Sequence, residues 1–262
     1  MEDTASRVKL VGNTNSTTPL ILCFHGSGDS CASWASLSDL LSDSYQVLLY
    51  DRQGPDMKPD MATHKMLSDL DEAHLHPPYM LVAHSYGGTF ARLFLEQRPQ
   101  HVAGMVLVET GQETAIDADV EQQQYKRQIL GHKPLVVIRG NTLIHKWEQY
   151  QETLAAENNI ATPSLLVQKQ LLDATDREDE RLKKAQLQLS RNHRYIHIPD
   201  CGHGVIQARP DVVAEAICWA MENQQTKNEK ETARKGLGLW LREIGDTSFV
   251  RDIARCLGKS GS

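Results

Sequence analysis

The segment with the clearest chemical signal is residues 83–87, Ala-His-Ser-Tyr-Gly, which follows an apolar run and precedes a helical pattern. A serine at the apex of a sharp strand-to-helix turn is held in strained backbone geometry, with its hydroxyl projecting above the sheet. Small residues are needed two positions before and after it; Gly87 meets this need and Ala83 nearly meets it. The pattern therefore predicts Ser85 as a nucleophile. The alternative interpretation is an ordinary serine that caps a helix after a strand.

A serine hydroxyl is a poor nucleophile at neutral pH and needs a base beside it. Of the eleven histidines, His203 is the candidate, because it sits in a Gly-His-Gly loop after the last strand-like run and before a helical pattern. A lone histidine is more often structural. His84, the neighbour of Ser85, is expected to point away from it into the protein, and His25 is expected to shape its own turn.

The elements that must position these residues are short apolar runs alternating with longer amphipathic stretches. Runs without clean alternation suit strands that are buried on both faces of a parallel sheet. They lie at residues 19–24, 45–50, 79–83, 102–108, 134–138 and 195–198. Helical spacing of apolar residues follows at 34–41, 90–97 and 212–219. We therefore predict the α/β class, with a mostly parallel central sheet and helices on both faces. Functional loops are expected at the carboxyl edge of the sheet.

Composition excludes several classes of protein. The chain has 262 residues, 40% of them hydrophobic and 24% charged, with a formal net charge of −6. This composition excludes wholesale disorder, and the charge does not favour a nucleic-acid partner. No apolar run approaches the roughly 18 residues that a membrane span needs. The five cysteines are scattered and odd in number. They predict a reduced, cytoplasmic chain, without a disulfide framework or a zinc site.

The order of the motifs resembles that of the α/β-hydrolase superfamily across residues 18–222. The similarity is strongest to its esterase, epoxide-hydrolase and lactonase-like branch. The motifs are HGSG at 25–28, YDRQG at 50–54, AHSYGG at 83–88, VLVE at 106–109 and CGHG at 201–204. Ala83 stands where this superfamily usually has glycine. The resemblance implies the α/β-hydrolase fold with a helical lid and a Ser-His-acid triad that needs no cofactor or metal.

The acid of this triad is the least certain member. Many relatives carry it shortly after the strand expected at 134–138, but residues 139–145 contain no carboxylate. Glu109, at the end of the preceding run, is therefore the expected acid. It would orient His203 through the second ring nitrogen and stabilise the imidazolium that forms. Asp200 and Glu148 remain alternatives.

The tetrahedral intermediate of acyl transfer needs two N–H groups aimed at its oxyanion. The resemblance implies the backbone N–H of Tyr86, which follows the nucleophile, and that of Ser27 in the HGSG loop. The Gly-x-Gly of this loop lacks a third glycine at the spacing of a dinucleotide fingerprint. No cofactor is therefore expected.

Two domains are expected, at 1–222 for the hydrolase and 223–262 for a basic, helical C-terminal extension. The extension carries eight Lys or Arg against five Asp or Glu. It is expected to dock on the domain or to serve self-association or partner contact. The lid candidates are 112–132 and 142–192. The charge run at 176–184 within the second is interpreted as a solvated helix face. The apolar residues expected to line a pocket there are Tyr125, Trp147, Tyr150, Leu165 and Leu166.

The function expected from these motifs is hydrolysis of an ester, lactone or thioester of a small, mainly apolar molecule through an acyl-enzyme. A serine at position 85 disfavours epoxide and haloalkane hydrolysis, because those branches need a carboxylate nucleophile. One alternative is a biosynthetic lyase, a cyclase or a carbon–carbon bond-cleaving enzyme that uses the same triad. The other is a ligand-binding protein of the same fold with little turnover.

Overall fold

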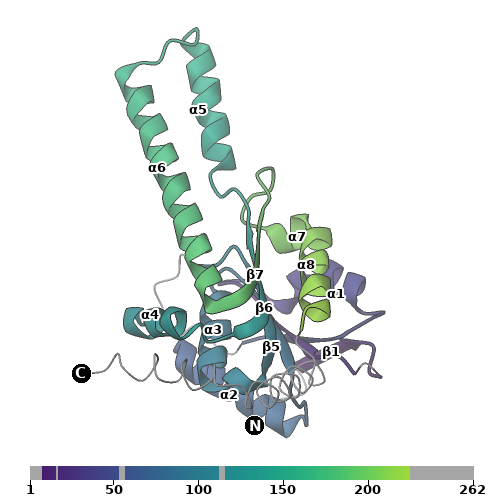
Figure 1. Ribbon diagram of the computed structural model, residues 1–262. Coiled ribbons are helices and arrows are strands. Elements are labelled where there is room, and N and C mark those ends of the chain that lie inside the picture. Colours follow the sequence, from purple (N-terminus) through teal and green to yellow (C-terminus); the bar gives the residue numbers. More distant parts are fainter. Residues whose placement is uncertain (1–7, 16, 53–56, 112–115, 225–262) are drawn as a thin grey trace, which may run out of the picture. The chain divides into compact units, whose positions relative to one another are not determined.

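The computed structural model describes residues 8–15, 17–52, 57–111 and 116–224. Its centre is a seven-stranded sheet in the order β1-β3-β2-β4-β5-β6-β7 (Figure 1). The strands are β1 (Val8–Gly12), β2 (Leu20–Phe24), β3 (Gln46–Tyr50), β4 (Tyr79–His84), β5 (Val102–Val108), β6 (Gly131–Arg139) and β7 (Ser190–His197). β1 pairs with β3 in antiparallel orientation, and the neighbours from β3 to β7 pair in parallel. The predicted, mostly parallel sheet is confirmed.

Helices lie on both faces of the sheet, as predicted. Figure 1 shows α1, α7 and α8 on one side and α2, α3 and α4 on the other. The helices are α1 (Ala35–Leu41), α2 (Pro59–Glu72), α3 (Gly87–Gln97), α4 (Ala118–Arg127), α5 (Ile144–Ala156), α6 (Pro163–Ala185), α7 (Val205–Ala208) and α8 (Pro210–Glu222), with short 3₁₀ turns η2 (Cys31–Trp34), η3 (Pro99–His101) and η4 (Gln186–Leu189).

Each central strand contributes to two hydrophobic cores. Along β2, Leu22 belongs to the core under α2 and α3, whereas its neighbours Ile21 and Cys23 belong to the core under α1 and α8. Successive strand residues point to opposite faces, so a strand covered on both faces must be apolar at every position. All five residues of β2 are buried. This is why the central strands appeared as continuous apolar runs.

The edge strand β1 was not anticipated from the sequence. Its five residues, VKLVG, are half-buried or exposed. A strand at a sheet edge needs no continuous apolar signal, because only part of its surface is covered. It was therefore hidden in the polar N-terminal stretch.

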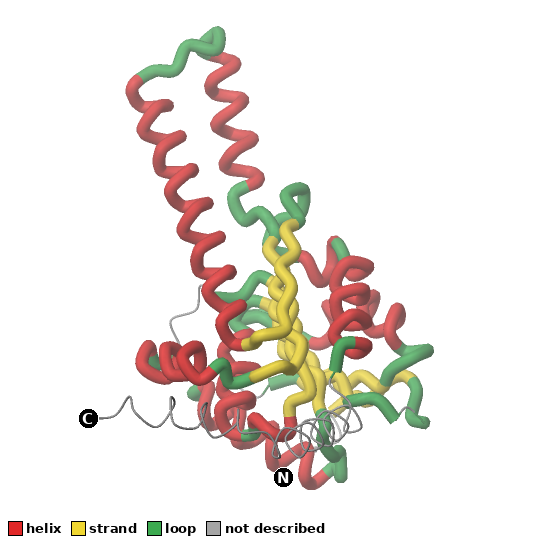
Figure 2. The backbone as a smooth tube through the Cα atoms, in the orientation of Figure 1, coloured by secondary structure: helices red, strands yellow, loops and turns green. Residues whose placement is uncertain are grey.

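The helices α5 and α6 form a hairpin that extends away from the sheet, here called the arm (Figures 1 and 2). α6 begins with Pro163 at its first turn, where a missing N–H costs nothing, and the side chain of Thr162 accepts a hydrogen bond from the Leu165 N–H. The two helices bury a small core of their own against each other. It consists of Leu143, Tyr150, Leu165 and Leu172, with Trp147 and Leu154 at its margin.

This packing overturns the predicted pocket lining in the arm. Trp147, Tyr150 and Leu165 contact one another between the two helices, and Leu166 is 49% exposed. Tyr125 lies on α4, where it hydrogen-bonds to Glu121 and Arg92 and does border a cavity, although the other four residues do not line it. A hairpin that leaves the body must bury its apolar stripe internally, so these residues do not meet around one ligand.

The charge run at 176–184 is also only partly solvated. Glu178, Arg181 and Lys184 are exposed, as expected of a solvated face. Asp179 and Lys183, however, are 4% and 0% exposed. These two face the body of the protein from the same helix, so the interpretation of the whole run as a solvated face was wrong.

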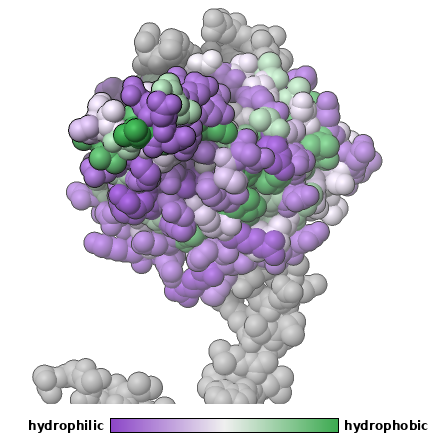
Figure 3. All heavy atoms as spheres, turned by 90° about the horizontal axis from the view of Figure 1, so that it is seen from above, coloured by the Kyte–Doolittle hydropathy of each residue, from purple (hydrophilic) through white to green (hydrophobic). Residues whose placement is uncertain are grey.

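From above, the surface is mostly hydrophilic, and its apolar residues form small separate patches (Figure 3). In the described part of the chain, no helix combines the length and apolar character that crossing a membrane requires. A compact unit ends at Gln224. The predicted C-terminal extension lies outside the described residues apart from Asn223 and Gln224, so its helical character stays a prediction. The assignment of a lid to 112–132 or 142–192 also stays a prediction.

Candidate active site

The turn between β4 and α3 holds Ser85 in a strained conformation. Its φ is +51°, in the left-handed region that non-glycine residues rarely adopt. The Ser85 N–H donates to the Val108 carbonyl at 3.0 Å, which fixes the turn against the end of β5. A Cβ at Gly87 would collide with the backbone carbonyl of Phe24, and one at Gly88 would come within 2.7 Å of Thr110 Cγ2. Both glycines are therefore required for the close approach of helix and sheet.

Glu109 follows the last residue of β5 and is 2% exposed. Its φ is +53°, and its N–H donates to the Ile138 carbonyl at 2.9 Å. The two carboxylate oxygens have different partners. Oε1 accepts a hydrogen bond from the Gly140 N–H at 2.6 Å, and Oε2 lies 3.1 Å from His203 Nδ1. The structure thus brings together Glu109 and His203, which are 94 positions apart in the chain.

The two alternative acids lie elsewhere. Asp200 has a side chain that is 79% exposed and lies 4.0 Å from Arg209. Glu148 is on α5, with a side chain 60% exposed and hydrogen-bonded to His145 at 2.9 Å. Within the described residues, the carboxylate that meets His203 is Glu109. Its role as the triad acid is taken up below as a proposal.

His84 is buried, in keeping with the expectation that it points into the protein, and its ring contacts the loop of His203. Its ring centroid lies 4.9 Å from that of His203, and its Nε2 donates to the His203 carbonyl at 2.9 Å. A carbonyl only accepts, so Nε2 carries the proton. Burial, with the nearby His203, lowers the pKa of His84 despite this hydrogen bond. His84 therefore acts as a neutral donor that ties the His203 loop to the residue beside Ser85.

The loop at 25–28 lies directly against the turn. A Cβ at Gly26 would sit 3.3 Å from Ser85 Cβ, which is tight enough to force an adjustment. His25 shapes this loop, as expected, because its Nδ1 donates to the Gly26 carbonyl at 2.9 Å and its Nε2 accepts from the Arg52 N–H at 3.4 Å. Burial and the Arg52 charge lower the pKa of His25, which favours this neutral form.

Arg52 also supports this loop, although sequence reasoning gave it no role. Its Nη2 donates to the Gly26 carbonyl at 2.9 Å, and its guanidinium stacks 4.2 Å from the centroid of the Phe90 ring. Burial lowers the pKa of Arg52 to about 10, still well above neutral pH. The position of Arg52 in the YDRQG motif was the available signal, because the carboxyl ends of neighbouring parallel strands share one edge.

A cavity of about 260 Å³ opens between this loop and α3. Ser27 and Tyr86, the residues expected to supply the two N–H groups, both border it. Its described lining is His25, Gly26, Ser27, Gly28, Asp29, Arg52, Met57, Ala62, Tyr86 and Phe90. Within the described residues no hydrogen bond joins the Ser85 hydroxyl to His203, whose side chain is 46% exposed. Such catalytic contacts are often long before substrate binds.

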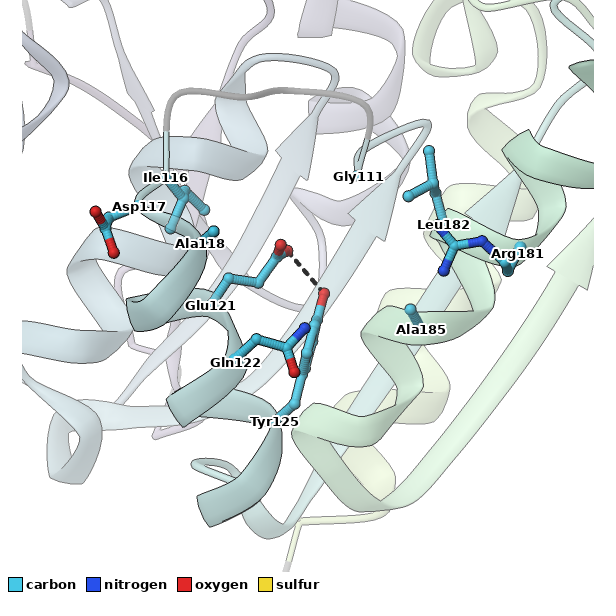
Figure 4. Close-up of a pocket in the computed structure, with 10 residues that line it drawn as sticks. All are labelled: Gly111, Ile116, Asp117, Ala118, Glu121, Gln122, Tyr125, Arg181, Leu182 and Ala185. Atoms are coloured by element: carbon cyan, nitrogen blue, oxygen red, sulfur yellow. Dashed lines mark hydrogen bonds between the residues drawn. The ribbon is translucent and has the colours of Figure 1, made fainter.

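A larger cavity, of about 500 Å³, lies between α4 and the end of α6 (Figure 4). Figure 4 shows Glu121 and Tyr125 of α4 on one side and Arg181, Leu182 and Ala185 of α6 on the other. The Tyr125 hydroxyl donates to Glu121, one turn earlier on α4, at 2.9 Å. Gly111, two residues after Glu109, borders this cavity too. Cavities therefore border both the loop at 25–28 and the residues that follow β5.

Comparison with known proteins agrees with this fold. The sequence profile of the alpha/beta hydrolase fold family matches residues 19–143. The chain has the α/β-hydrolase fold. The resemblance to the α/β-hydrolase superfamily that the motifs indicated is confirmed at the level of the superfamily.

Two curated relatives of this α/β-hydrolase-fold chain match most of its length. It is 24% identical over 293 residues to "Probable transporter efuK" of Hormonema carpetanum, which covers 84% of this chain and 41% of that relative. It is also 24% identical over 215 residues to "Uncharacterized protein YqjL" of Bacillus subtilis, covering 76% of this chain and 83% of that relative. The chain thus spans less than half the length of the first of these relatives.

Solved structures share the α/β-hydrolase fold at low sequence identity. An enol-lactonase from Burkholderia xenovorans LB400 has a TM-score of 0.55 and 14% identity, over 82% of this chain and 95% of its own. The esterase RhEst1 from Rhodococcus sp. ECU1013 has a TM-score of 0.55 and 13% identity, over 83% and 94%. At such identities the likeness shows the fold and leaves the substrate open.

Proposed function

We propose that this chain is a serine hydrolase that cleaves an ester, lactone or thioester of a small, mainly apolar molecule. The observation that carries the proposal is the 3.1 Å contact between Glu109 Oε2 and His203 Nδ1, beside the strained turn of Ser85. The three residues follow three different strands, β4, β5 and β7, and the carboxyl ends of parallel strands share one edge of the sheet. The esterase and enol-lactonase among the structural neighbours support the same class of reaction.

In the proposed reaction, His203 Nε2 takes the proton of the Ser85 hydroxyl as Oγ bonds to the substrate carbonyl carbon. Glu109 accepts the Nδ1 hydrogen bond and stabilises the imidazolium. When the tetrahedral intermediate collapses, the carbon–heteroatom bond breaks and His203 returns the proton to the leaving alcohol or thiol. A water molecule then attacks the acyl-enzyme with the same proton transfers, which releases the acid and restores Ser85.

The N–H groups of Tyr86 and Ser27 are the proposed donors to the oxyanion. Both residues border the cavity of about 260 Å³, and the loop of Ser27 is fixed by His25 and Arg52 through the Gly26 carbonyl. A donor that is held before the reaction begins needs no reorganisation as charge develops, and one such hydrogen bond contributes about 3 kcal/mol. The cavity size suits a small acyl group.

A cytoplasmic location is proposed with this function. Cys23, Cys31 and Cys201 are buried free thiols in the described part of the chain, and burial raises their pKa values. Unpaired buried cysteines are typical of reducing compartments.

The test is labelling with a fluorophosphonate, which reacts with activated serines. The wild-type chain should be labelled, and Ser85→Ala should lose labelling. Ser68→Ala, an exposed serine on α2, serves as the matched control and should be labelled like wild type. Hydrolysis of p-nitrophenyl acetate should fall at least about 10³-fold in Ser85→Ala.

Two outcomes would contradict the proposal. Labelling that survives in Ser85→Ala would show that the probe reacts with another residue and that Ser85 is not the nucleophile. Labelling at Ser85 without turnover on a broad panel of esters, thioesters and lactones would favour the lyase, cyclase or ligand-binding alternatives.

A further inference from the structure

A buried lysine lies on the side of Glu109 away from His203. Lys183, in the last turn of α6, is 0% exposed, and its Nζ lies 3.7 Å from Glu109 Oε1. Oε1 is the oxygen that accepts the Gly140 N–H, whereas Oε2 is the one that meets His203. A fully buried ammonium is costly unless it is paired. Its position therefore calls for a physical explanation.

Lys183 belongs to a chain of alternating charges that leads from the arm to Glu109. Its Nζ donates to Asp179 Oδ1 at 2.7 Å, and Arg139 Nε donates to Asp179 Oδ2 at 2.7 Å. Arg139 Nη2 donates in turn to the half-exposed Asp176 at 2.5 Å. Burial opposes ionisation of Asp179, but the hydrogen bonds from Lys183 and Arg139 outweigh it, so the pKa of Asp179 is lowered. Both carboxylate–cation contacts are thus between charged groups.

This arrangement bears on the ionisation and orientation of Glu109. Burial alone favours the neutral form of a carboxyl group, and a nearby cation favours the anion. The Gly140 N–H and the Lys183 ammonium both act on Oε1. Oε2 is thereby left to accept from His203 Nδ1. A neutral or rotated Glu109 would not fix the tautomer of His203 that leaves Nε2 free to take a proton.

We propose that Lys183 is a positioning residue, which keeps Glu109 ionised and turned so that Oε2 meets His203. The inference rests on the proposed function, since it concerns the acid of that triad. Asp179 and Arg139 hold Lys183 in place from α6 and β6. The C-terminal end of the arm helix thus supplies part of the support of the site.

The backbone around Lys183 has a second anchor that does not depend on charge. Gln186 accepts from the Thr110 hydroxyl at 2.7 Å and donates to the Thr110 carbonyl at 3.1 Å, next to Glu109. These neutral hydrogen bonds join the end of α6 to the end of β5. A substitution at Lys183 can therefore remove the charge while the two elements stay joined.

The first test compares Lys183→Met with Lys184→Met, its exposed neighbour, which pairs with Glu180. For hydrolysis of p-nitrophenyl acetate, Lys183→Met should lower kcat about tenfold with KM within twofold of wild type, and Lys184→Met should change neither. The charged groups that pair with Lys183 are Glu109, which follows β5, and Asp179 from α6. Arg139 from β6 pairs with Asp179 and Asp176, and His203 lies beyond Glu109.

Removing the cation makes it easier to add a proton to the Glu109–His203 pair. The acidic limb of the kcat/KM profile should therefore move to higher pH in Lys183→Met. Unchanged kcat and an unchanged limb would overturn the proposal. If Lys183→Met is too unstable to measure, the Asp179→Asn/Lys183→Met double variant removes both charges of the Lys183–Asp179 pair and is held to the same criteria.

A readout without turnover separates this proposal from the proposed function. The titration of the His203 ring can be followed by NMR whether or not the chain hydrolyses the ester. The pH titration of the His203 ring should differ from wild type in Lys183→Met, because the charge and orientation of Glu109 change, and should match wild type in Lys184→Met. A His203 titration that is the same in all three proteins would refute the positioning role even if Ser85 proves to be the nucleophile.

Discussion

The carboxyl ends of the central strands and the arm differ in how their residues are packed. At the carboxyl ends of β4 and β5, Ser85 and Glu109 both have positive φ and follow strands whose residues are buried on both faces. In the arm, α5 and α6 cover each other with a small core, and Val167 and Leu171 are both 66% exposed. Among the described non-glycine residues with positive φ, Ser85 and Glu109 lie where two cores meet. Asn158 and Asn159 lie in the exposed loop at the tip of the arm, where asparagine adopts the left-handed region at little cost.

This difference indicates which part of the molecule can hold functional residues in a strained backbone conformation. Strain of about 1–3 kcal/mol at a residue persists only when its surroundings determine the conformation. The turn of Ser85 has this support from Phe24, Val108 and Thr110, which come from neighbouring strand ends. The outer part of the arm has no such surroundings. Only its inner end, at Lys183, shares in the support of the site.

The largest expected effect in this comparison is on kcat, which should depend on Glu109 beside His203 and not on Glu148 in the arm. Glu109→Gln should lower kcat at least about 10²-fold, because the amide keeps the shape of the side chain but loses the charge that stabilises the imidazolium. Glu148→Gln, at an alternative acid on the arm, should change kcat less than twofold. Steady-state hydrolysis of p-nitrophenyl acetate measures both. A near-wild-type rate in Glu109→Gln would show that Glu109 is not the triad acid.

A second comparison concerns stability. Leu107→Ala, in the centre of β5 at 0% exposure, should lower the free energy of unfolding by about 3 kcal/mol. Leu172→Ala, in the arm core, should lower it by about 2 kcal/mol and leave kcat within twofold. Leu171→Ala, its exposed neighbour, should change it by less than about 0.5 kcal/mol. Denaturant unfolding gives all three values. Equal losses at positions 171 and 172 would contradict the described arm core.

The smallest effect is the dependence of stability on pH. The folded-state pKa of His84 is lowered from the ordinary 6.5, chiefly by burial. Below pH 6.5 the unfolded chain therefore binds a proton that the folded chain resists, so this histidine makes stability fall as pH falls. The Tm of His84→Gln should vary less between about pH 5 and 8 than that of wild type. His145→Gln, at an exposed histidine of the arm, should keep the wild-type pH dependence.

The sequence was sufficient to predict those parts of the fold that depend on a few neighbouring residues. Each buried strand appears as an apolar run, and the Ser85 turn appears as small residues around a serine between strand and helix. The edge strand β1 was missed because it is not buried. The pocket assigned to Trp147, Tyr150 and Leu165 was wrong because an apolar stripe does not reveal whether it meets a ligand or a second helix.

The amino-acid sequence by itself determined the alternation of strands and helices and the turn that carries Ser85. Only the tertiary structure decided that Glu109, and neither Asp200 nor Glu148, lies against His203, that His84 ties the His203 loop in place, and that Lys183 is buried within a run of charges. The physical reason is that backbone propensity acts over a few residues, whereas these contacts join side chains up to 119 positions apart. Their distances depend on how the strands are ordered in the sheet.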